Sequence, residues 1–221
     1  MTNSYELLEL LKNKGYDATK RDKFWWPNSG SFDVVVGAIL TQQTKWEKVE
    51  KSLENLKNGR VLDLKSLADI DVRVLSVLIK PSGFYNTKAK NLSKLSKAID
   101  ATFGSFEDFA QNVTREWLLS QKGVGEESAD AILCYSCLRD ECVVDRYTAR
   151  LLASFGFSFE SYGELKAWMM EGIASNKKRV DALYSRLMSS HEVYARFHGK
   201  IVEYAKTHNK GREVKVNALI E

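Results

Sequence analysis

A Gly-Val-Gly segment, Gly123–Gly125, separates two stretches of helical pattern near the middle of the chain. Two glycines around the apolar Val124 let a backbone approach a phosphate closely, and the N-terminus of the following helix adds positive potential. With Lys122 before it and Ser128 after it, this hairpin could hold a phosphate group. A plain turn between two helices explains the same pattern equally well.

Asp145 lies twenty positions beyond Gly125, directly before the helical pattern that begins at Arg146. A carboxylate in this place accepts hydrogen bonds from the first turn of the helix and is kept ionised by the helix dipole. Such an anion suits the stabilisation of positive charge, or the activation of water, better than acid catalysis. Taken by itself, a structural N-cap explains the aspartate as well.

The hairpin and the aspartate at this spacing resemble the helix-hairpin-helix DNA glycosylase superfamily, which combines a Gly/Pro-rich loop with an essential aspartate. Three other segments are similar to parts of that family: Leu40–Thr44 to its glutamine-bearing minor-groove segment, Gly83–Ala89 to the stretch after its third helix, and Phe197–Lys200 to its last core helix. The resemblance covers about residues 30 to 205.

The resemblance implies a role for each of these parts. Breaking a base–sugar bond develops positive charge on the deoxyribose, and Asp145 is the fixed anion that this catalysis requires. The expected partner is double-stranded DNA that contains a damaged base. The hairpin would hold its backbone, and Gln42 or Gln43 would fill the gap left by the extruded nucleotide.

One departure narrows the expected reaction. Family members that also cut the DNA backbone carry a lysine two residues after the second glycine of the hairpin, where it forms a Schiff base. This chain has Glu127 there. We therefore expect a monofunctional glycosylase of base excision repair, which hydrolyses the N-glycosidic bond, leaves an abasic site and has no lyase activity. Glu127 is also an ordinary first-turn acid of a helix, and both statements can hold.

We expect no cofactor, and the cysteines argue against an iron-sulfur cluster or a zinc site. Iron-sulfur members of the family place four cysteines beyond the last helix, whereas no cysteine follows Cys142 in this chain. The spacing of Cys134, Cys137 and Cys142 resembles a zinc site but lacks a fourth ligand nearby. Small buried residues explain the three better. Three cysteines cannot all pair with one another, and these three lie within nine positions, which favours a reducing compartment.

Aromatic residues are the candidates for a base pocket. Indole rings stack well on cationic rings, and alkylation at a purine nitrogen makes such a ring and a good leaving group. We expect Trp25 and Trp46 to stack on the base, beside Trp26 and Pro27. This loop, the missing cluster and the short length resemble the compact 3-methyladenine DNA glycosylases, the MagIII type. Packing explains at least one of these tryptophans, most simply Trp26, and we assign Trp117 and Trp168 to the core.

A lysine on the last helix approaches the pocket in that subfamily, and Lys206 is the matching position. The resemblance places it opposite Asp145 and allows a carbamate on its amine. A solvated lysine near a helix C-terminus is an equally good interpretation. His191 and His198 are expected to be surface or capping residues of this helix rather than ligands.

Two other functions stay open. A glycosylase for oxidised or mismatched bases would be expected to carry the lyase lysine or the cysteine loop, and the sequence has neither. A non-catalytic helix-hairpin-helix module, used for recruitment or architecture, would use the hairpin and the net positive charge equally well. Such a module has no need of Asp145 at this spacing or of an aromatic pocket.

The elements that must position these residues are predicted to be helical. The chain has 13 glycines and 2 prolines, where average usage would give roughly 27 in total. This shortage argues against a sandwich or barrel and for an all-α fold. We expect two interleaved helical subdomains with a cleft between them: a central helical barrel over 31–134, which includes the helix-hairpin-helix, and a second subdomain of 1–30 plus 135–221, which carries Asp145.

Apolar spacing, caps and breakers predict where the helices lie. Ser4 is expected to cap the first helix, which ends near Gly15, and a wholly buried helix is expected over 32–40. A brief extended segment is expected over 142–144. The other predicted helices or helical turns cover 46–58, 72–79, 86–104, 106–109, 115–119, 126–138, 146–154, 162–174, 179–188 and 191–207.

Composition sets wide limits on location and partners. The formal net charge of the 221 residues is +4, which permits a polyanionic partner but does not require one. The longest apolar stretch, Val34–Leu40, is far below the roughly 18 residues of a membrane span. Because Glu6 and Glu9 stand among the first leucines, we expect no signal peptide. We expect a monomeric cytoplasmic protein, associated with the nucleoid if prokaryotic, and no membrane partner.

Overall fold

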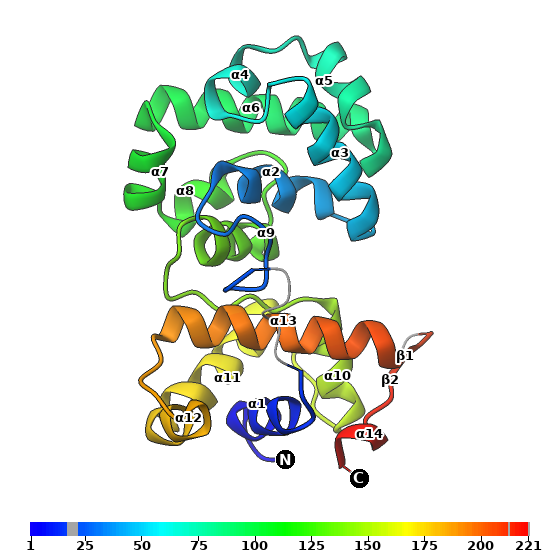
Figure 1. Cartoon of the computed structure of the whole chain (residues 1–221), viewed down its shortest axis with the longest axis vertical. Helices are drawn as coiled ribbons and strands as arrows, with labels where there is room; N and C mark the ends of the chain where they lie inside the picture. The colour runs from blue at the N-terminus through cyan, green and yellow to red at the C-terminus, as the bar shows by residue number, and fades with distance from the viewer. Residues whose placement is uncertain (17–21, 212, 221) are drawn as a thin grey trace. The chain divides into compact units, whose positions relative to one another are not determined.

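The structure is a computed structural model that describes residues 1–16, 22–211 and 213–220. The described part is built of helices and one two-stranded hairpin, which confirms the expected all-α fold class (Figure 1). It divides into two compact units. We call Gly30–Leu138 the central unit, and Met1–Ser29 together with Arg139–Glu221 the terminal unit. No helix within the described ranges is long and apolar enough to cross a membrane.

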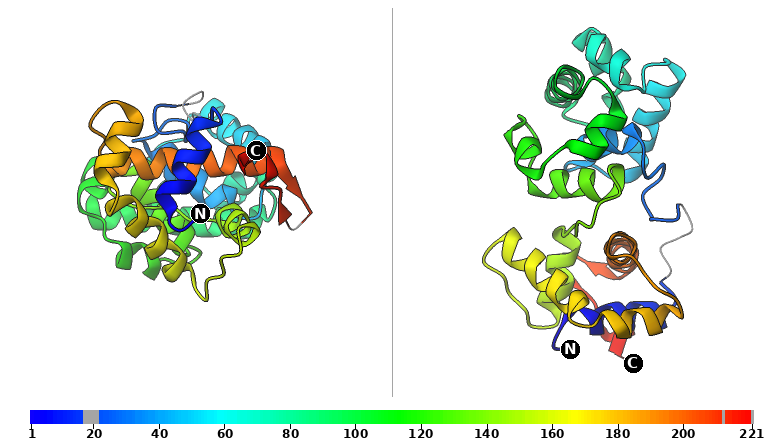
Figure 2. Two further views of the ribbon diagram at one scale, coloured as in Figure 1. Left: turned by 90° about the horizontal axis from the view of Figure 1, so that it is seen from below. Right: turned by 90° about the vertical axis from the view of Figure 1, so that its left-hand side faces the viewer.

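The central unit is formed by a continuous series of helices. These are α2 (Phe32–Thr41), α3 (Trp46–Asn58), α4 (Leu64–Asp69), α5 (Val72–Leu78), the 3-10 helix η1 (Lys80–Ser82), α6 (Tyr85–Phe103), α7 (Phe106–Asn112), α8 (Arg115–Ser120), α9 (Glu126–Ala131) and the π-helical segment η2 (Ile132–Ser136). Figure 2 (right) looks nearly along α6, against which α4 and α5 pack.

Local sequence determines most of these elements. The apolar run in α2 is buried along almost its whole length, as the sequence predicts. Short polar side chains begin the surface helices: those of Asp71, Ser105 and Thr114 each accept a hydrogen bond from a backbone N–H in the first turn of α5, α7 and α8. The short helix α4, capped by Asp63, was not predicted, because six residues carry too little periodicity.

The helix predicted over 126–138 is interrupted. Regular α-helix ends at Ala131, and the chain continues through the wider turn Ile132–Ser136. The carbonyl of Tyr135 accepts a hydrogen bond of 2.8 Å from the backbone N–H of Gly30. A bond from a residue so distant in sequence gives this turn partners that helical periodicity does not encode.

The terminal unit combines both ends of the chain. Its elements are α1 (Ser4–Asn13), α10 (Arg146–Ser154), α11 (Tyr162–Ala174), α12 (Lys177–Tyr184), α13 (Ser190–His208), the hairpin strands β1 (Asn209–Lys210) and β2 (Glu213–Val214), and α14 (Asn217–Ile220). In this unit α1 packs against α11, α13 and α14, and α10 packs against α13 and β2.

The start of α1 differs from the prediction. Asn3, not Ser4, is the N-cap, and its side chain accepts a hydrogen bond of 3.1 Å from the N–H of Glu6. The Ser4 hydroxyl is buried and instead donates to the carbonyl of Met169 on α11, at 2.7 Å. A Cβ at Gly172 would lie 2.3 Å from this hydroxyl, so α1 and α11 approach each other closely here. The segment 142–144 pairs with no strand in the described part.

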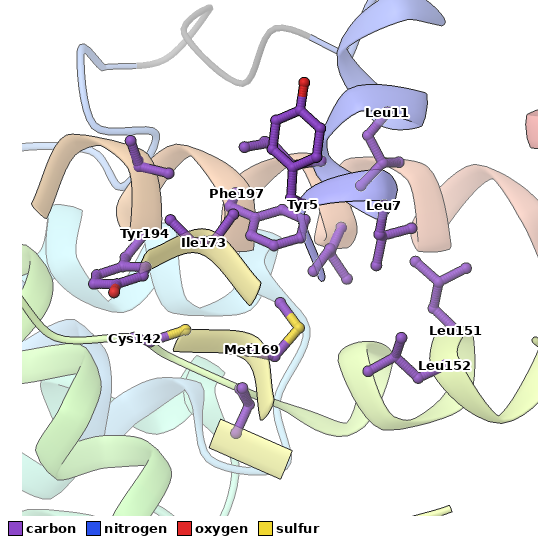
Figure 3. Close-up of a cluster of buried hydrophobic side chains, with 14 of the residues drawn as sticks. Tyr5, Leu7, Leu11, Cys142, Leu151, Leu152, Met169, Ile173, Tyr194 and Phe197 are labelled. Atoms are coloured by element: carbon purple, nitrogen blue, oxygen red, sulfur yellow. The ribbon is translucent and has the colours of Figure 1, made fainter. Parts of the chain in front are cut away.

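The core of the terminal unit surrounds α13. Figure 3 shows leucines of α1 and α10, Met169 and Ile173 of α11 and Phe197 of α13 meeting in one apolar cluster. Thirteen of the nineteen residues of α13 are buried. Each large side chain buried in such a cluster stabilises the fold by about 1.5 to 3 kcal/mol. The helix α13 is therefore a rigid support for the side chains that line it.

Candidate active site

Asp145 begins α10 as a complete N-cap. Its Oδ1 accepts hydrogen bonds from the backbone N–H of Thr148 at 2.8 Å and from the Thr148 hydroxyl at 3.0 Å. The backbone N–H of Asp145 donates to the same hydroxyl at 3.3 Å, which closes a capping box. These contacts occupy one carboxylate oxygen and fix the direction of the other.

The second oxygen of Asp145, Oδ2, faces a histidine. It lies 3.6 Å from Nε2 of His198, and the two side chains are only 13% and 5% exposed. Burial raises the pKa of Asp145, but the contacts with His198 and the hydrogen bonds from Thr148 outweigh it and hold the pKa below its usual range. The carboxylate is therefore a fixed anion at neutral pH.

The expected surface position of the two histidines was wrong: His198 and His191 are both buried on α13. That neither serves as a ligand stays a prediction. The His198 ring lies between Asp145 and the Trp25 indole, whose centroid is 5.1 Å away. The His191 ring packs edge-on against Phe24 at 4.5 Å. The sequence signal was the apolar face of α13 on which both stand, at a spacing of seven residues.

Trp25 is held against α13 by two contacts. Its Nε1 donates a hydrogen bond of 3.0 Å to Oε1 of Glu203. A Cβ at Gly199 would lie 2.4 Å from Cγ of the indole, so only glycine lets the ring approach the helix so closely. The backbone of Trp25 has a left-handed φ of 77°, a conformation that costs a large side chain energy and requires support from its surroundings. Glu203 could not be predicted from local sequence, because 178 positions separate it from its partner.

The residues after Trp25 turn inward. Trp26 is 7% exposed and packs edge-on against Trp25, whereas Pro27 is half-buried. The start of the loop is tied to α13 by Arg196, whose Nε donates to the Lys23 carbonyl at 3.2 Å. The buried Glu192 in turn binds Arg196 at 2.9 Å. The loop therefore presents Trp25 from a fixed base.

Lys206 lies at the same end of α13. Its ammonium nitrogen is 6.0 Å from the centroid of the Trp25 ring and 4.0 Å from Oε1 of Glu203. A carboxylate neighbour suits an ammonium group better than a carbamate anion, so the carbamate stays an untested prediction. The terminal unit thus brings together Asp145, His198, Trp25, Glu203 and Lys206.

The predicted DNA-binding residues lie in the central unit. Nε2 of Gln42 donates to the Gly123 carbonyl at 2.8 Å and to Oγ of Ser128 at 3.0 Å. Gln43, in contrast, is exposed with a left-handed φ of 52°. Lys122, Gly123 and Gly125 are exposed, while Val124 and Ser128 are buried.

The hairpin is supported from behind. Gly123 has a φ of 89°, which disfavours other residues, and a Cβ there would lie 2.2 Å from Nδ2 of Asn91. Both the backbone conformation and the lack of space therefore require glycine. Arg115 of α8 binds Asp130 of α9 through Nε and Oδ1 at 2.7 Å, with Glu126 3.4 Å from the same guanidinium group. The bond to Asp130 raises the pKa of Arg115 further above its already high value. This ion pair, which sequence analysis did not identify, holds α8 and α9 together.

The remaining candidates are distributed as follows. Trp46 is half-buried at the start of α3 in the central unit, whereas Trp25, Trp26, Pro27 and Lys206 belong to the terminal unit. Glu127 is exposed in the first turn of α9. Trp117 and Trp168 are half-buried and pack against phenylalanines, at ring distances of 5.1 and 4.9 Å.

The cysteines form no cluster with other ligands. Cys134 and Cys142 are buried, Cys137 is half-buried, and none of the three is in a disulfide. Across residues 1–16, 22–211 and 213–220, no group of three or more His, Cys, Asp or Glu side chains is arranged to hold a metal ion.

Comparisons with known proteins identify similar sequences and structures. The family model described as HhH-GPD superfamily base excision DNA repair protein matches residues 36–175. A candidate DNA repair glycosylase of Methanocaldococcus jannaschii is 38% identical over 189 residues, which is 82% of this chain and 80% of that protein. The crystal structure of the Helicobacter pylori 3-methyladenine DNA glycosylase MagIII, bound to 1,N6-ethenoadenine, is 46% identical. The superposition covers 94% of this chain and 99% of the MagIII chain, with a TM-score of 0.90.

More distant structures share the fold. A trapped covalent intermediate of endonuclease III with DNA is 16% identical, with a TM-score of 0.72 over 97% of this chain and 92% of that one. At this identity the likeness concerns the fold alone.

Proposed function

Because the chain belongs to the HhH-GPD superfamily of base excision DNA repair proteins and is a DNA glycosylase of that kind, we propose that it is a monofunctional enzyme for alkylated purines. It binds double-stranded DNA, hydrolyses the N-glycosidic bond of 3-methyladenine-like bases and leaves an abasic site. The 46% identity with a 3-methyladenine DNA glycosylase supports this substrate class.

The observation that carries the proposal is the buried Asp145 carboxylate, with Oδ1 tied to Thr148 and Oδ2 3.6 Å from His198. As the glycosidic bond breaks, its electron pair leaves with the alkylated base, which becomes neutral, and positive charge develops at the sugar. The fixed anion stabilises this charge. Water then adds its oxygen to the sugar carbon and releases a proton, which the carboxylate can accept.

Trp25 supports the choice of a cationic base. The contacts with Glu203 and Gly199 fix its indole before any base arrives. The Lys206 ammonium lies 6.0 Å from the ring centroid, as expected of a ring face that attracts positive charge. A purine alkylated at a ring nitrogen carries the same charge, and its departure needs little acid catalysis.

Glu127 supports hydrolysis without a lyase step. It occupies the position where a lyase would carry its lysine, and its exposed carboxylate cannot form a Schiff base. Gln43 is the better candidate than Gln42 for filling the gap in the duplex, because the hairpin already engages the Gln42 amide.

Base release from DNA treated with dimethyl sulfate tests the proposal. We expect free 3-methyladenine in chromatography, unbroken abasic strands, and no covalent complex with DNA after borohydride treatment. The Asp145→Asn variant is the matched control, since asparagine is an equally good N-cap but carries no charge. Absence of any methylated base among the products would overturn the substrate class, and a trapped complex would overturn the hydrolytic mechanism.

A further inference from the structure

Lys88 is a buried lysine in the second turn of α6, and its side chain serves neither the hairpin nor the aspartate directly. It is 4% exposed. Its ammonium group donates to the Leu40 carbonyl at 2.7 Å, to the Thr44 hydroxyl at 2.7 Å and to the Ser82 carbonyl at 2.9 Å. All three acceptors are neutral oxygens. Burying a charged amine is unfavourable, so this arrangement needs a reason beyond packing.

The three acceptors come from three places in the chain. Leu40 is in the last turn of α2, where the helix dipole favours a cation. Thr44 belongs to the loop between α2 and α3, and Ser82 ends η1. The Thr44 hydroxyl also donates to the Ser82 carbonyl at 2.6 Å. One ammonium group therefore ties the loop after α2 to the turn before α6.

Gln42 extends this connection to the hairpin. Its side-chain amide donates to the Gly123 carbonyl and to the Ser128 hydroxyl, as described above. Its own carbonyl lies 3.1 Å from the Thr44 hydroxyl. The Thr44 hydroxyl has one proton, which the Ser82 and Gln42 carbonyls share, with the shorter distance to Ser82. A continuous set of polar contacts thus runs from Lys88 through Thr44 and Gln42 to Gly123.

The segments joined in this way end in three exposed tips, which are Gln43, Phe84 and Gly123. All three have left-handed backbones, with φ of 52°, 45° and 89°. Phe84 is 70% exposed, which is unusual for so large an apolar side chain. Left-handed conformations at Gln43 and Phe84 are costly and persist where the surrounding structure enforces them.

We propose that Lys88 is a positioning residue for DNA binding, which acts through Thr44 and Gln42 to hold the three tips in one fixed arrangement before DNA arrives. Gln42 is then an internal brace, and Gln43 faces the duplex. Fixing the tips in advance lowers the entropy lost on binding. Burial lowers the pKa of Lys88 to about 8, so at neutral pH it still carries the proton that its three bonds require. The inference rests on the proposed function for the identity of the ligand.

Two matched pairs of variants test this role. Thr44→Val removes the hydroxyl while keeping the shape, and Thr44→Ser keeps the hydroxyl. Lys88→Met removes the ammonium group, and Leu92→Ala removes a buried side chain of the same helix. The readouts are amide hydrogen exchange of the free protein at residues 42–44 and 123, and affinity for a duplex with a stable abasic-site analogue.

We expect Thr44→Val and Lys88→Met to speed exchange in these segments and to weaken DNA binding by about tenfold. Thr44→Ser and Leu92→Ala should stay within about twofold of the wild-type affinity, although Leu92→Ala lowers stability. Gln42→Ala should also weaken DNA binding. The double variant Gln42→Ala/Thr44→Val should lose less binding free energy than the sum of the losses of the two single variants.

Unchanged exchange and affinity in Thr44→Val would overturn the inference, as would a loss of affinity in Leu92→Ala equal to that in Lys88→Met. Failure of the wild-type protein to bind the duplex would instead overturn the proposed function and, with it, the DNA part of the inference. The exchange measurement needs no DNA, so it tests separately whether Lys88 and Thr44 hold these segments in place.

Discussion

Two charged side chains, Asp145 of the terminal unit and Lys88 of the central unit, are held in opposite ways. The anion Asp145 has one oxygen occupied by Thr148 and the other next to His198. The cation Lys88 is surrounded by neutral oxygens of three segments. The anion is placed to act on the positive charge that develops at the sugar. All three hydrogen bonds of the cation go to oxygens of the protein itself.

This difference separates chemistry from positioning. A reacting group needs a free side, and Oδ2 of Asp145 has a neighbour at 3.6 Å, longer than a full hydrogen bond. A positioning group is best fully satisfied, as Lys88 is by three bonds of 2.7 to 2.9 Å. Variants in the terminal unit should therefore affect the rate of base release, and those in the Lys88 network should affect DNA affinity.

The largest effect is expected for Asp145→Asn. Loss of the fixed anion should slow base release by at least about 1,000-fold, while abasic-site binding stays within about tenfold, since phosphate contacts are unaffected. Single-turnover release of 3-methyladenine and a binding titration check the two parts. A variant with nearly wild-type turnover would remove Asp145 from the mechanism.

A smaller effect is expected when the indole is displaced. Gly199→Ala adds a Cβ that would lie 2.4 Å from the Trp25 ring, so release should slow by about ten- to a hundredfold, as in Trp25→Ala. Alanine favours the helix by about 1 kcal/mol over glycine, so helix propensity opposes any loss of stability. Release rates should be read beside thermal unfolding. If either variant unfolds while activity per folded molecule is unchanged, Trp25 belongs to the core and not to the pocket.

For Trp46 the prediction depends on the substituent. Trp46→Phe should change the release rate by less than about threefold, because an aromatic face remains, whereas Trp46→Ala should slow release by about tenfold or more. Equal rates for the two variants would show that Trp46 does not stack on the base.

Lys88 should also be visible in the pH dependence of stability. Its pKa is about 8 in the folded protein and near 10.5 in the unfolded chain, so between these values the unfolded state binds more protons and the fold gains stability as the pH rises. The wild type should therefore gain about 2 kcal/mol in free energy of unfolding relative to Lys88→Met between pH 8 and 10.5. Chemical denaturation at several pH values measures it, and a constant difference between the two proteins would contradict the burial of the charge.

Sequence alone was sufficient where the signal is local. The buried helix α2 and the position of Asp145 directly before α10 depend on residues within one or two turns. The start of α1 was misassigned because Asn3 and Ser4 are both capping residues. The buried bond to Met169, distant in sequence, decides between them.

The candidate site was predictable only in part. The motif resemblance identified Asp145 and the hairpin, and their functional roles stay predictions. Glu203, His198 and Lys88 acquire their meaning from partners far along the chain, such as Trp25 for Glu203 and Leu40 for Lys88. No local pattern of charge or periodicity encodes such pairs, so their contribution became visible only in the folded chain.

The central claim is that Asp145 serves the release of the base, whereas the Lys88 network serves DNA binding. Single-turnover release of 3-methyladenine at increasing enzyme concentration tests it for Asp145→Asn and Thr44→Val together. We expect Asp145→Asn to lose the maximal rate while half-saturation stays within about tenfold. Thr44→Val should keep the maximal rate and need about tenfold more enzyme for half-saturation. A full maximal rate in Asp145→Asn, or a lost one in Thr44→Val, would contradict the account.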